Sequence, residues 1–599
     1  LLFSLKLSLA EDPKDNGSPE NLIVYGTRLQ QPTVDVGSNI SVLTAGDIKA
    51  LGSNYLVDSI SSLPGVTVNQ NGSFGGTATV RIRGASSEQT LVIIDGVIVN
   101  DPTSPGGGFD FSRIDPSNVE RIEVLRGPQS TLWGTDAMGG VINIITKRPE
   151  KGINKKVFAQ AGSFNTFRSG AEFNQATDTY NLRLAATAIS SDGISKADEI
   201  NGNSEKDGYD AKTINAAAGI ELWEDARLQT NFLWTDAKSD FDSYTFGAQG
   251  SIGDGNEYSK TEELNANLKF LFPLLNGKLE NVLLAGFSDI ERESFNAGVS
   301  SFASEGSRNT FQYQGTLKIN EMHRFAFGAE HEKNKANENN SSVNGLFALY
   351  EFKAFDSLVI NAGLRLDDHN RYSAVTTSRF SLAFNPHDQI TLLASWDEGF
   401  KSPTIFQTTF FCCGATSPNS NLKPESSESF NIGVIYQTLN ARGKIGLTYF
   451  DQDTTNLINY SSGSYENIAS AASSGVEIDS NFIFTEWFSA NLNFTYLNAK
   501  DSSGNKLARV PERSGDLSLI LKMNDKISGS LRVKYNGEEQ DLNGIVASWS
   551  RTDLTSNYIY NDSLEIYARI ENIFDKQYQQ IIGYGTPGIS GHLGARFGF

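Results

Sequence analysis

From residue 151 to the C-terminus, the sequence consists of segments in which apolar and polar residues alternate. In the segment 488–496 every second residue is apolar, and the same holds for the segment 563–571. A period of two residues predicts β-strands with one apolar and one polar face. Such strands fit a soluble sandwich, which turns the apolar face to a core, and equally a membrane barrel, which turns that face to lipid.

The lengths of the connectors distinguish these two folds. We count about 22 candidate strands from Lys155 onward, which leaves roughly 20 residues for each strand and its connector. Short turns at one rim and long loops at the other are typical of outer-membrane barrels. The sequence therefore predicts a membrane β-barrel of antiparallel strands. The short connectors include 223–225, 319–321 and 438–440, and the long ones are 190–208, 239–257, 399–423 and 573–588.

Composition and charge exclude several other classes of protein. No apolar run approaches the roughly 18 residues that a spanning helix needs. The formal net charge of −20 argues against nucleic-acid binding, which requires a basic surface. The 5 histidines are scattered, and no nucleophile triad, phosphate loop or metalloprotease motif occurs. We therefore expect a protein that is not an enzyme.

The first 150 residues have a different texture, in which short apolar strands alternate with helix starts between residues 39 and 146. This pattern predicts a small α+β domain. A barrel of about 22 strands is wide enough to need an obstruction, so we expect this domain to plug the lumen. The predicted divisions are a signal remnant with a disordered lead (1–19), a short β-prone segment (20–27), the plug (28–150) and the transmembrane barrel (151–599).

Several short motifs follow one another in a fixed order along the chain. They are Glu20–Gly26, Leu63–Val66, Val80–Gly84, Ile94–Val97, Val119–Pro128, Gly139–Thr146, Asn421–Glu425 and Glu571–Asp575. On these motifs, residues 20–599 resemble a TonB-dependent outer-membrane receptor, and within that group the cobalamin transporters. The resemblance implies a location in the outer membrane of a Gram-negative bacterium. It also implies active import that is driven by the periplasmic protein TonB.

The β-prone segment resembles the TonB box of this family. A short extended segment on a flexible lead can add as a strand to the sheet edge of a partner. The alternative is an ordinary first strand of the plug. The residues of the expected TonB-binding segment are Glu20, Asn21, Leu22, Ile23, Val24, Tyr25 and Gly26.

Three plug arginines, Arg81, Arg83 and Arg126, are expected to pair with the barrel, as plug arginines do in the family. Glu477 fits one barrel partner. The resemblance implies a second glutamate at the position that Asn431 occupies, and this departure puts a full charge cluster in doubt. Buried pairs of this kind add little net stability but can fix the register of two parts.

Two long loops are rich in carboxylates. Asp192, Glu205, Asp207 and Asp242 match in spacing the calcium-binding loops of cobalamin transporters, although Glu205 stands where the family usually has Asp. Calcium takes six to eight oxygen ligands, so carboxylates that converge from two loops suit it. The alternative is an acidic, solvated loop.

The resemblance predicts import of a scarce, large nutrient, with cobalamin as the expected cargo. The cargo would bind at the plug apices, for which we select Gly72, Ser73, Phe74, Thr103 and Phe109. A ferric siderophore is the alternative cargo, but many ferric chelates are anionic and would favour basic loops. A signalling transducer would need a further N-terminal domain, and a passive porin would need no plug. We expect a monomer whose partners are TonB, the cargo and outer-membrane lipid.

The 2 cysteines, Cys412 and Cys413, are adjacent and lie in the long connector 399–423. The alternation of connectors places this loop outside the cell, an oxidising setting in which free thiols are unusual. A bond between them would form a small strained ring. The sequence leaves open whether they form a disulfide or remain two unreactive thiols.

Overall fold

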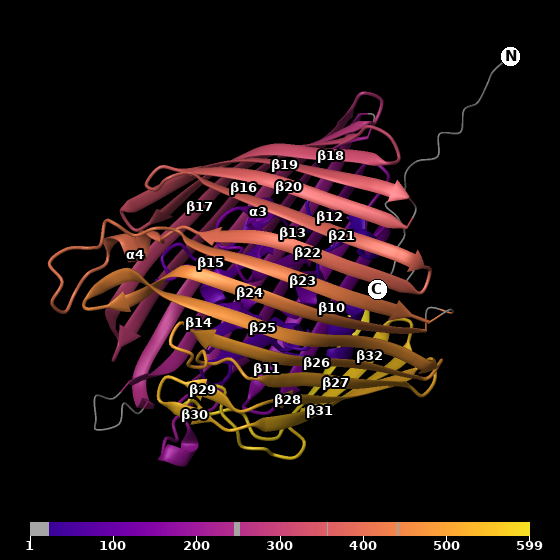
Figure 1. Ribbon diagram of the computed structural model, residues 1–599. Coiled ribbons are helices and arrows are strands. Elements are labelled where there is room, and N and C mark those ends of the chain that lie inside the picture. Colours follow the sequence, from indigo (N-terminus) through magenta and orange to yellow (C-terminus); the bar gives the residue numbers. More distant parts are fainter. Residues whose placement is uncertain are drawn as a thin grey trace.

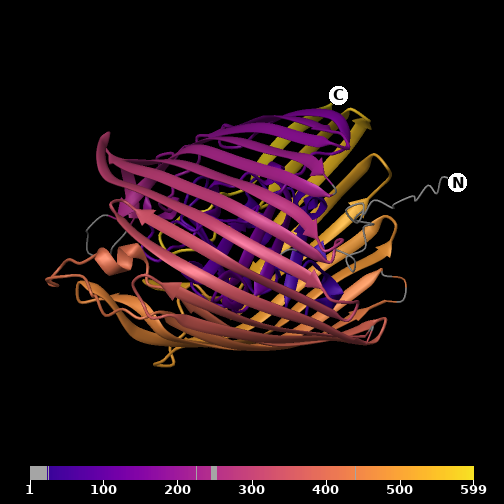
Figure 2. The ribbon, with the colours of Figure 1, turned by 90° about the horizontal axis from the view of Figure 1, so that it is seen from above.

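The computed structural model describes residues 23–24, 26–223, 225–244, 252–355, 357–438, 440 and 442–599. Within these residues, no helix is long and apolar enough to cross a membrane. The fold has two parts, a closed barrel and a smaller domain inside it (Figure 1, Figure 2).

The barrel is one closed sheet of 22 antiparallel strands, in which the last strand pairs with the first and Phe597 lies opposite Val157. This arrangement confirms the fold that the sequence predicts. The strands are β10 (Gly152–Gly162), β11 (Thr166–Ala176), β12 (Tyr180–Ser191), β13 (Tyr209–Trp223), β14 (Ala226–Tyr244), β15 (Ile252–Leu274), β16 (Leu279–Asn296), β17 (Val299–Lys318), β18 (His323–Ala336), β19 (Asn339–Phe355), β20 (Leu358–His369), β21 (Val375–His387), β22 (Ile390–Lys401), β23 (Glu425–Gln437), β24 (Gly443–Ser461), β25 (Ser464–Thr485), β26 (Phe488–Asp501), β27 (Arg513–Lys522), β28 (Ile527–Asn536), β31 (Trp549–Asn561), β32 (Leu564–Glu571) and β33 (Ser590–Gly598).

The two rims of the barrel differ, as the connector lengths predict. Helix α4 (Ile405–Thr409) and the hairpin of β29 (Glu539–Asp541) and β30 (Gly544–Val546) lie at the end opposite the C-terminus (Figure 1). The connector expected over residues 239–257 is shorter in the structure, because β14 and β15 continue to pair until Tyr244 lies opposite Ile252.

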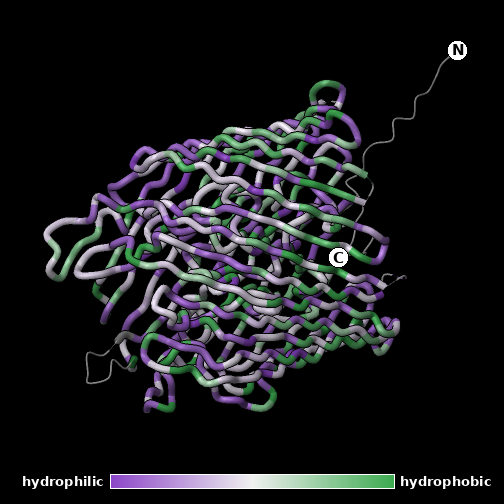
Figure 3. Tube along the Cα trace, in the orientation of Figure 1, coloured by the Kyte–Doolittle hydropathy of each residue, from purple (hydrophilic) through white to green (hydrophobic). Residues whose placement is uncertain are grey.

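Side chains of the barrel strands point alternately outward and inward. On β18 the inward residues Glu330 and Glu332 are buried, whereas Leu346 and Phe311 on the neighbouring strands face outward and are 58% and 59% exposed. Figure 3 shows this alternation of hydrophobic and hydrophilic residues along the strands. An apolar outer surface and a polar interior are what a membrane barrel requires.

The plug fills the lumen (Figure 2). Its main sheet has the order β3-β8-β9-β6-β7, in which β6 and β9 are parallel, and its core contains the fully buried Leu56, Ile82 and Ile122. Its elements are β1 (Ile23–Val24), β2 (Gln31–Pro32), β3 (Ile40–Thr44), α1 (Ala45–Leu51), α2 (Leu56–Ile60), β4 (Val66–Gln70), β5 (Ala78–Ile82), β6 (Thr90–Ile94), β7 (Val97–Ile98), β8 (Val119–Arg126), α3 (Ser130–Trp133) and β9 (Gly140–Thr146).

Local sequence signals explain where α1 begins and ends. The hydroxyl of Thr44 accepts a hydrogen bond from the Asp47 amide, and the Asp47 carboxylate accepts one from the Thr44 amide, which is a capping box. The helix ends at Gly52, whose φ of 67° is a left-handed conformation that glycine adopts without strain.

Candidate functional site

A buried ion cluster joins the plug to the barrel wall. Arg83, which follows β5, donates from Nε to Glu477 Oε1 at 2.8 Å and from Nη2 to Oε2 at 2.9 Å. Nε of Arg126 lies 3.3 Å from the same Oε2. All three side chains are at most 2% exposed. A two-bond contact between a guanidinium and a carboxylate fixes the orientation of both groups.

Asn431 takes a neutral place in this cluster. Its Oδ1 accepts a hydrogen bond from Arg83 Nη1 at 2.5 Å, and its Nδ2 donates to Ser395 at 3.1 Å. The cluster therefore contains two arginines and one carboxylate, with an amide as the further acceptor. A neutral acceptor satisfies the remaining donor without a second buried charge.

Arg81, the third plug arginine that is expected to pair with the barrel, does not contact Glu477 and lies outside this cluster. Arg83 has left the strand with a φ of 52°, and Arg81 is directed elsewhere. Burial lowers the pKa of Arg81, as does the nearby Arg509, while Glu88 and, more weakly, Glu539 of β29 oppose this shift. The carboxylates that act on Arg81 are therefore others than Glu477.

The predicted TonB box lies only partly within the described residues. Glu20, Asn21, Leu22 and Tyr25 lie outside them, and Ile23 and Val24 form β1. This strand pairs antiparallel with β2, with Ile23 opposite Pro32 and Val24 opposite Gln31. The amide of Gly26 donates to Glu123 Oε2 at 2.7 Å, and its carbonyl accepts from Trp133 Nε1 at 2.8 Å. The segment is thus bound to the plug at its last residue.

Arg28 binds the same segment to the barrel, a contact that the sequence did not reveal. Its Nε donates to the Leu132 carbonyl at 2.5 Å, and its Nη2 lies 3.0 Å from Glu330 Oε2 of β18. The guanidinium stacks on Trp133, with its central carbon 4.1 Å from the ring centroid. The one signal for this contact in the sequence is the presence of an arginine shortly after the predicted TonB box. The contacts of α3 and β18 therefore converge on Arg28.

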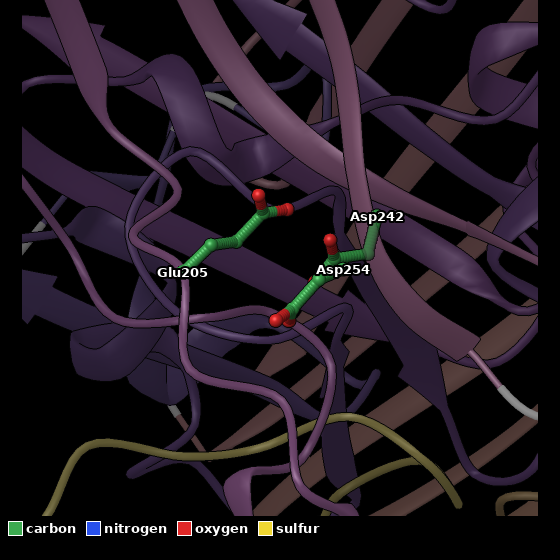
Figure 4. Close-up of side chains that lie close together, drawn as sticks. All are labelled: Glu205, Asp242 and Asp254. Atoms are coloured by element: carbon green, nitrogen blue, oxygen red, sulfur yellow. The ribbon is translucent and has the colours of Figure 1, made fainter.

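Carboxylates from the connector after β12 and from the end of the β14–β15 hairpin converge outside the plug. One oxygen each of Glu205, Asp242 and Asp254 lies within 4.8 Å of the others (Figure 4). Asp254 was missed by the sequence reasoning, although it stands between two glycines in the predicted connector. Asp192 is not a member of this group and instead lies 3.6 Å from Lys206. Asp207 is also outside the group and accepts a hydrogen bond from the Lys196 amide at 2.6 Å.

The electrostatics of this cluster favour a bound proton or cation. Burial and the neighbouring Asp242 raise the pKa of Glu205 to about 7. Burial, again with Asp242, raises the pKa of Asp207 to about 7. Carboxylates held this close repel one another when they are ionised, and a positive charge among them relieves that repulsion.

The plug apices are covered by the barrel. Phe74 is 6% exposed and packs on Tyr55 and Tyr209, and Gly72 lies against the Lys196 side chain. A Cβ at Gly72 would approach Lys196 to 2.7 Å.

The other selected apex residues are also buried. Phe109 packs edge-on against Phe111, and Thr103 is bonded to Asp101, while Ser73 is 4% exposed. All five selected apex residues are thus buried, and their contact with a cargo stays a prediction. Thr77 and Pro105 are the exposed positions of the two apices.

Cys412 and Cys413 form a disulfide in the connector that follows α4. The Cys412 amide donates to the Gly463 carbonyl at 2.8 Å, and the ring of Phe410 packs at an angle against the rings of Tyr460 and Tyr465. The loop therefore rests on the tip of the β24–β25 hairpin as an aromatic knob at the outer rim.

These features define a class of protein: an outer-membrane barrel with a plug that polar contacts hold in place. Residues 32–141 match the family model described as the TonB-dependent receptor plug domain, and residues 152–573 match the one described as the TonB dependent receptor-like beta-barrel. The chain belongs to the family of TonB-dependent receptors. Its members are not enzymes, lie in the outer membrane of Gram-negative bacteria, bind a ligand and interact with TonB.

Among curated proteins, the vitamin B12 transporter BtuB of Vibrio vulnificus strain YJ016 is 25% identical in an alignment of 588 residues that covers 94% of this chain and 91% of that protein. BtuB of Vibrio cholerae is 26% identical, and the alignment covers 94% of this chain and 93% of that protein. Among solved structures, the siderophore receptor PirA of Acinetobacter baumannii has a TM-score of 0.80 at 19% identity, with 94% and 98% covered. A mutant form of the ferric enterobactin receptor PfeA of Pseudomonas aeruginosa has a TM-score of 0.81 at 18% identity, with 96% and 100% covered.

Proposed function

We propose that this receptor imports cobalamin across the outer membrane with energy supplied through TonB. The observation that carries this proposal is the similarity to vitamin B12 transporters, which extends over 94% of the chain. The similarity includes both the plug and the barrel rather than the barrel alone. The cargo would enter from the rim that carries α4 and would bind above the plug.

The contacts of the TonB-box segment suggest how TonB would act. Gly26 is bonded to Glu123 and Trp133 of the plug, while Arg28 is bonded to Glu330 of the barrel. TonB would add a strand to the segment that contains Ile23 and Val24, because main-chain hydrogen bonds at a strand edge can bear a pulling force. Release of the contacts at Gly26 and Arg28 would then loosen the plug.

We also propose that the loop carboxylates bind calcium. The donors are all oxygens, which suits a hard cation. Glu205, Asp242 and Asp254 would supply ligands, and Asp207 stands beside them. The proposed site lies next to the plug apex, because Lys196 from the same loop contacts Gly72. Bound calcium would order the loop against that apex.

A ferric siderophore is the rival cargo, since the same fold is present in the siderophore receptors PirA and PfeA. The acidic group distinguishes the two cargoes only while no calcium is bound. Without calcium, Glu205, Asp242 and Asp254 would repel an anionic ferric chelate, and calcium bound among them would relieve that repulsion. The two cargoes therefore differ in their expected response to calcium and salt.

Equilibrium titration of the purified receptor with cyanocobalamin and with a panel of ferric siderophores tests the cargo. We expect saturable binding of cyanocobalamin and none of the siderophores; the reverse pattern would reject cobalamin. Uptake by cells that carry Leu22→Pro tests the coupling, since proline removes a main-chain donor. Normal binding with lost uptake is expected, and normal uptake would show that the TonB box is assigned to the wrong segment.

A further inference from the structure

The outer face of the barrel contains an apolar hollow of about 650 Å³ across β15 to β19. Two small outward residues, Ala285 and Ala329, lie at the floor of the hollow, on the barrel wall. Larger residues stand around them, namely Leu283, Phe311 and Leu346, which are 44%, 59% and 58% exposed. Cavities of 300–1,000 Å³ are the usual size of small-molecule sites. This hollow is therefore large enough to take part of a ligand rather than a few water molecules.

The register of the strands places the hollow just below a boundary in the outward residues. On β18 the outward residues change from apolar Phe327 and Ala329 to polar His331 and Lys333. On β19 the change occurs at the same row, because His331 lies opposite Asn344. On β17 it occurs one row higher, because His331 lies opposite Phe311 and Lys333 lies opposite Asn309. The polar residues are on the side of the α4 rim, which faces outside the cell. The hollow therefore lies in the outer-leaflet half of the hydrocarbon layer.

Polar groups at this boundary suit a phosphate. His331 Nδ1 lies 2.8 Å from Asn344 Oδ1, at the upper edge of the hollow. Lys333, one outward position higher, forms no ion pair with the described residues, and its two cross-strand neighbours are uncharged. Lys335, still higher, is paired with Glu305 at 2.8 Å.

The acidic side chains of β16 stand level with Lys335 or above it, whereas Asp368 of β20 lies opposite Asn344, in the row of His331. Asp289 of β16 lies opposite Ser307, which in turn lies opposite Lys335. Glu291 lies opposite Glu305, one row farther toward the rim. On β17, β18 and β19 the row of Lys333 thus offers one cation and two hydrogen-bonding side chains and no carboxylate. The outward carboxylate one row below it, Asp368, stands two strands away on β20.

We propose that this surface is a specific binding site for a phosphorylated, acylated lipid of the outer leaflet, such as lipid A. An acyl chain fills the hollow above Ala285 and Ala329, and a headgroup phosphate lies at Lys333, Asn309 and Ser342. Apolar burial and one lysine–phosphate contact act together, as at other membrane-surface sites. The site lies on the outer wall, away from the plug, so the proposal does not depend on the identity of the cargo.

Native mass spectrometry of the delipidated receptor, titrated with lipid A and with phosphatidylcholine, tests the proposal. We expect Ala329→Trp to weaken lipid A binding about ten-fold, because the indole fills the volume that the acyl chain needs. Lys333→Glu should weaken it about ten-fold or more while leaving phosphatidylcholine unchanged. Ala186→Trp and Lys212→Glu, outward positions on β12 and β13, are matched controls that should bind like the wild type.

Each variant is checked for the migration of a closed barrel on unboiled gels, so that a misfolded barrel is not mistaken for a lost site. Equal affinity of lipid A for Ala329→Trp and the wild type would overturn the proposal. Binding of phosphatidylcholine as tight as that of lipid A would also overturn it. A receptor dimer that Ala329→Trp disrupts, without bound lipid, would assign the hollow to a protein contact instead.

Discussion

The guanidinium of Arg83 in the plug donates two hydrogen bonds, of 2.8 and 2.9 Å, to the carboxylate of Glu477 in the barrel wall. Arg126 approaches the same carboxylate. One barrel side chain therefore compensates two buried plug cations. Because such a pair is more costly to break than it is stabilising to form, its main effect is to fix the plug in one position.

We expect Glu477→Gln to destabilise the seated plug by about 3–5 kcal/mol, because Arg83 and Arg126 are left without a buried counter-charge. Hydrogen exchange of the β5 and β8 amides in the folded receptor measures this. Glu512→Gln is the control, since Glu512 pairs with Lys506 at the surface. Unchanged protection of β5 in Glu477→Gln would show that the pair does not hold the plug.

We expect Glu330→Gln to expose the TonB-box segment, because Arg28 loses its barrel partner. The measurement is the rate at which a maleimide labels a cysteine introduced as Leu22→Cys, with Cys412 and Cys413 joined in their disulfide. Glu332→Gln is a matched control on the same face of β18, because Glu332 pairs with Arg308 instead. Equal labelling rates in the two variants would contradict a specific role for Glu330.

Calcium should tighten cobalamin binding, and Asp254→Asn should remove most of that effect, because the proposed site loses a charged oxygen ligand. Titration of cyanocobalamin with added calcium and with a chelator measures it. Asp192→Asn is the control, since Asp192 lies outside the group of three carboxylates. Identical affinities in calcium and in chelator would remove the basis for the metal site.

The β29–β30 hairpin should become less stable as the pH rises. Burial and the neighbouring Asp541 raise the pKa of Glu539 from 4.5 to about 7, so the folded hairpin keeps a proton that the unfolded chain releases. The contribution of Glu539 to stability is therefore largest below pH 4.5 and falls until the pH passes about 7. Hydrogen exchange of residues 537–546, corrected for intrinsic rates, measures this. The dependence should vanish in Glu539→Gln and persist in Glu538→Gln, and its persistence in both would assign it to another group.

Mild reduction should raise the intact mass by two hydrogens, because Cys412 and Cys413 form a disulfide. It should also loosen the aromatic knob at the rim, where the Cys412 amide is bonded to Gly463. Labelling of both cysteines by a thiol reagent in untreated cells would show that the bond is absent in the native protein. Ser461→Ala, on the same hairpin, is the control for changes in the loop that do not involve the disulfide.

The fold was largely predictable, because alternation and connector length are local signals that a barrel repeats many times. The pair of Arg83 and Glu477 was also accessible through the resemblance of short motifs. The partners of Arg28 were not, since Leu132 and Glu330 are separated from it by 104 and 302 residues and no local pattern marks such contacts. Asp254 was missed for a similar reason: its group forms only when the connector of Glu205 folds against the β14–β15 hairpin. The burial of Phe74 depends on Tyr209 of the barrel, which a reading of the plug alone does not include.

The antiparallel pairing of β1 with β2 determines how a load applied at the N-terminal end of the segment is distributed. Ile23 and Pro32 lie at the open end of this hairpin, and Val24 and Gln31 lie nearer its turn. A pull on the chain before Ile23, with the plug held after Pro32, opens such a hairpin like a zipper, so that the bonds bear the load one after another. The contacts of Gly26 come next along the chain, and those of Arg28 follow. A moderate, sustained force therefore suffices where a shear geometry would demand a single large one.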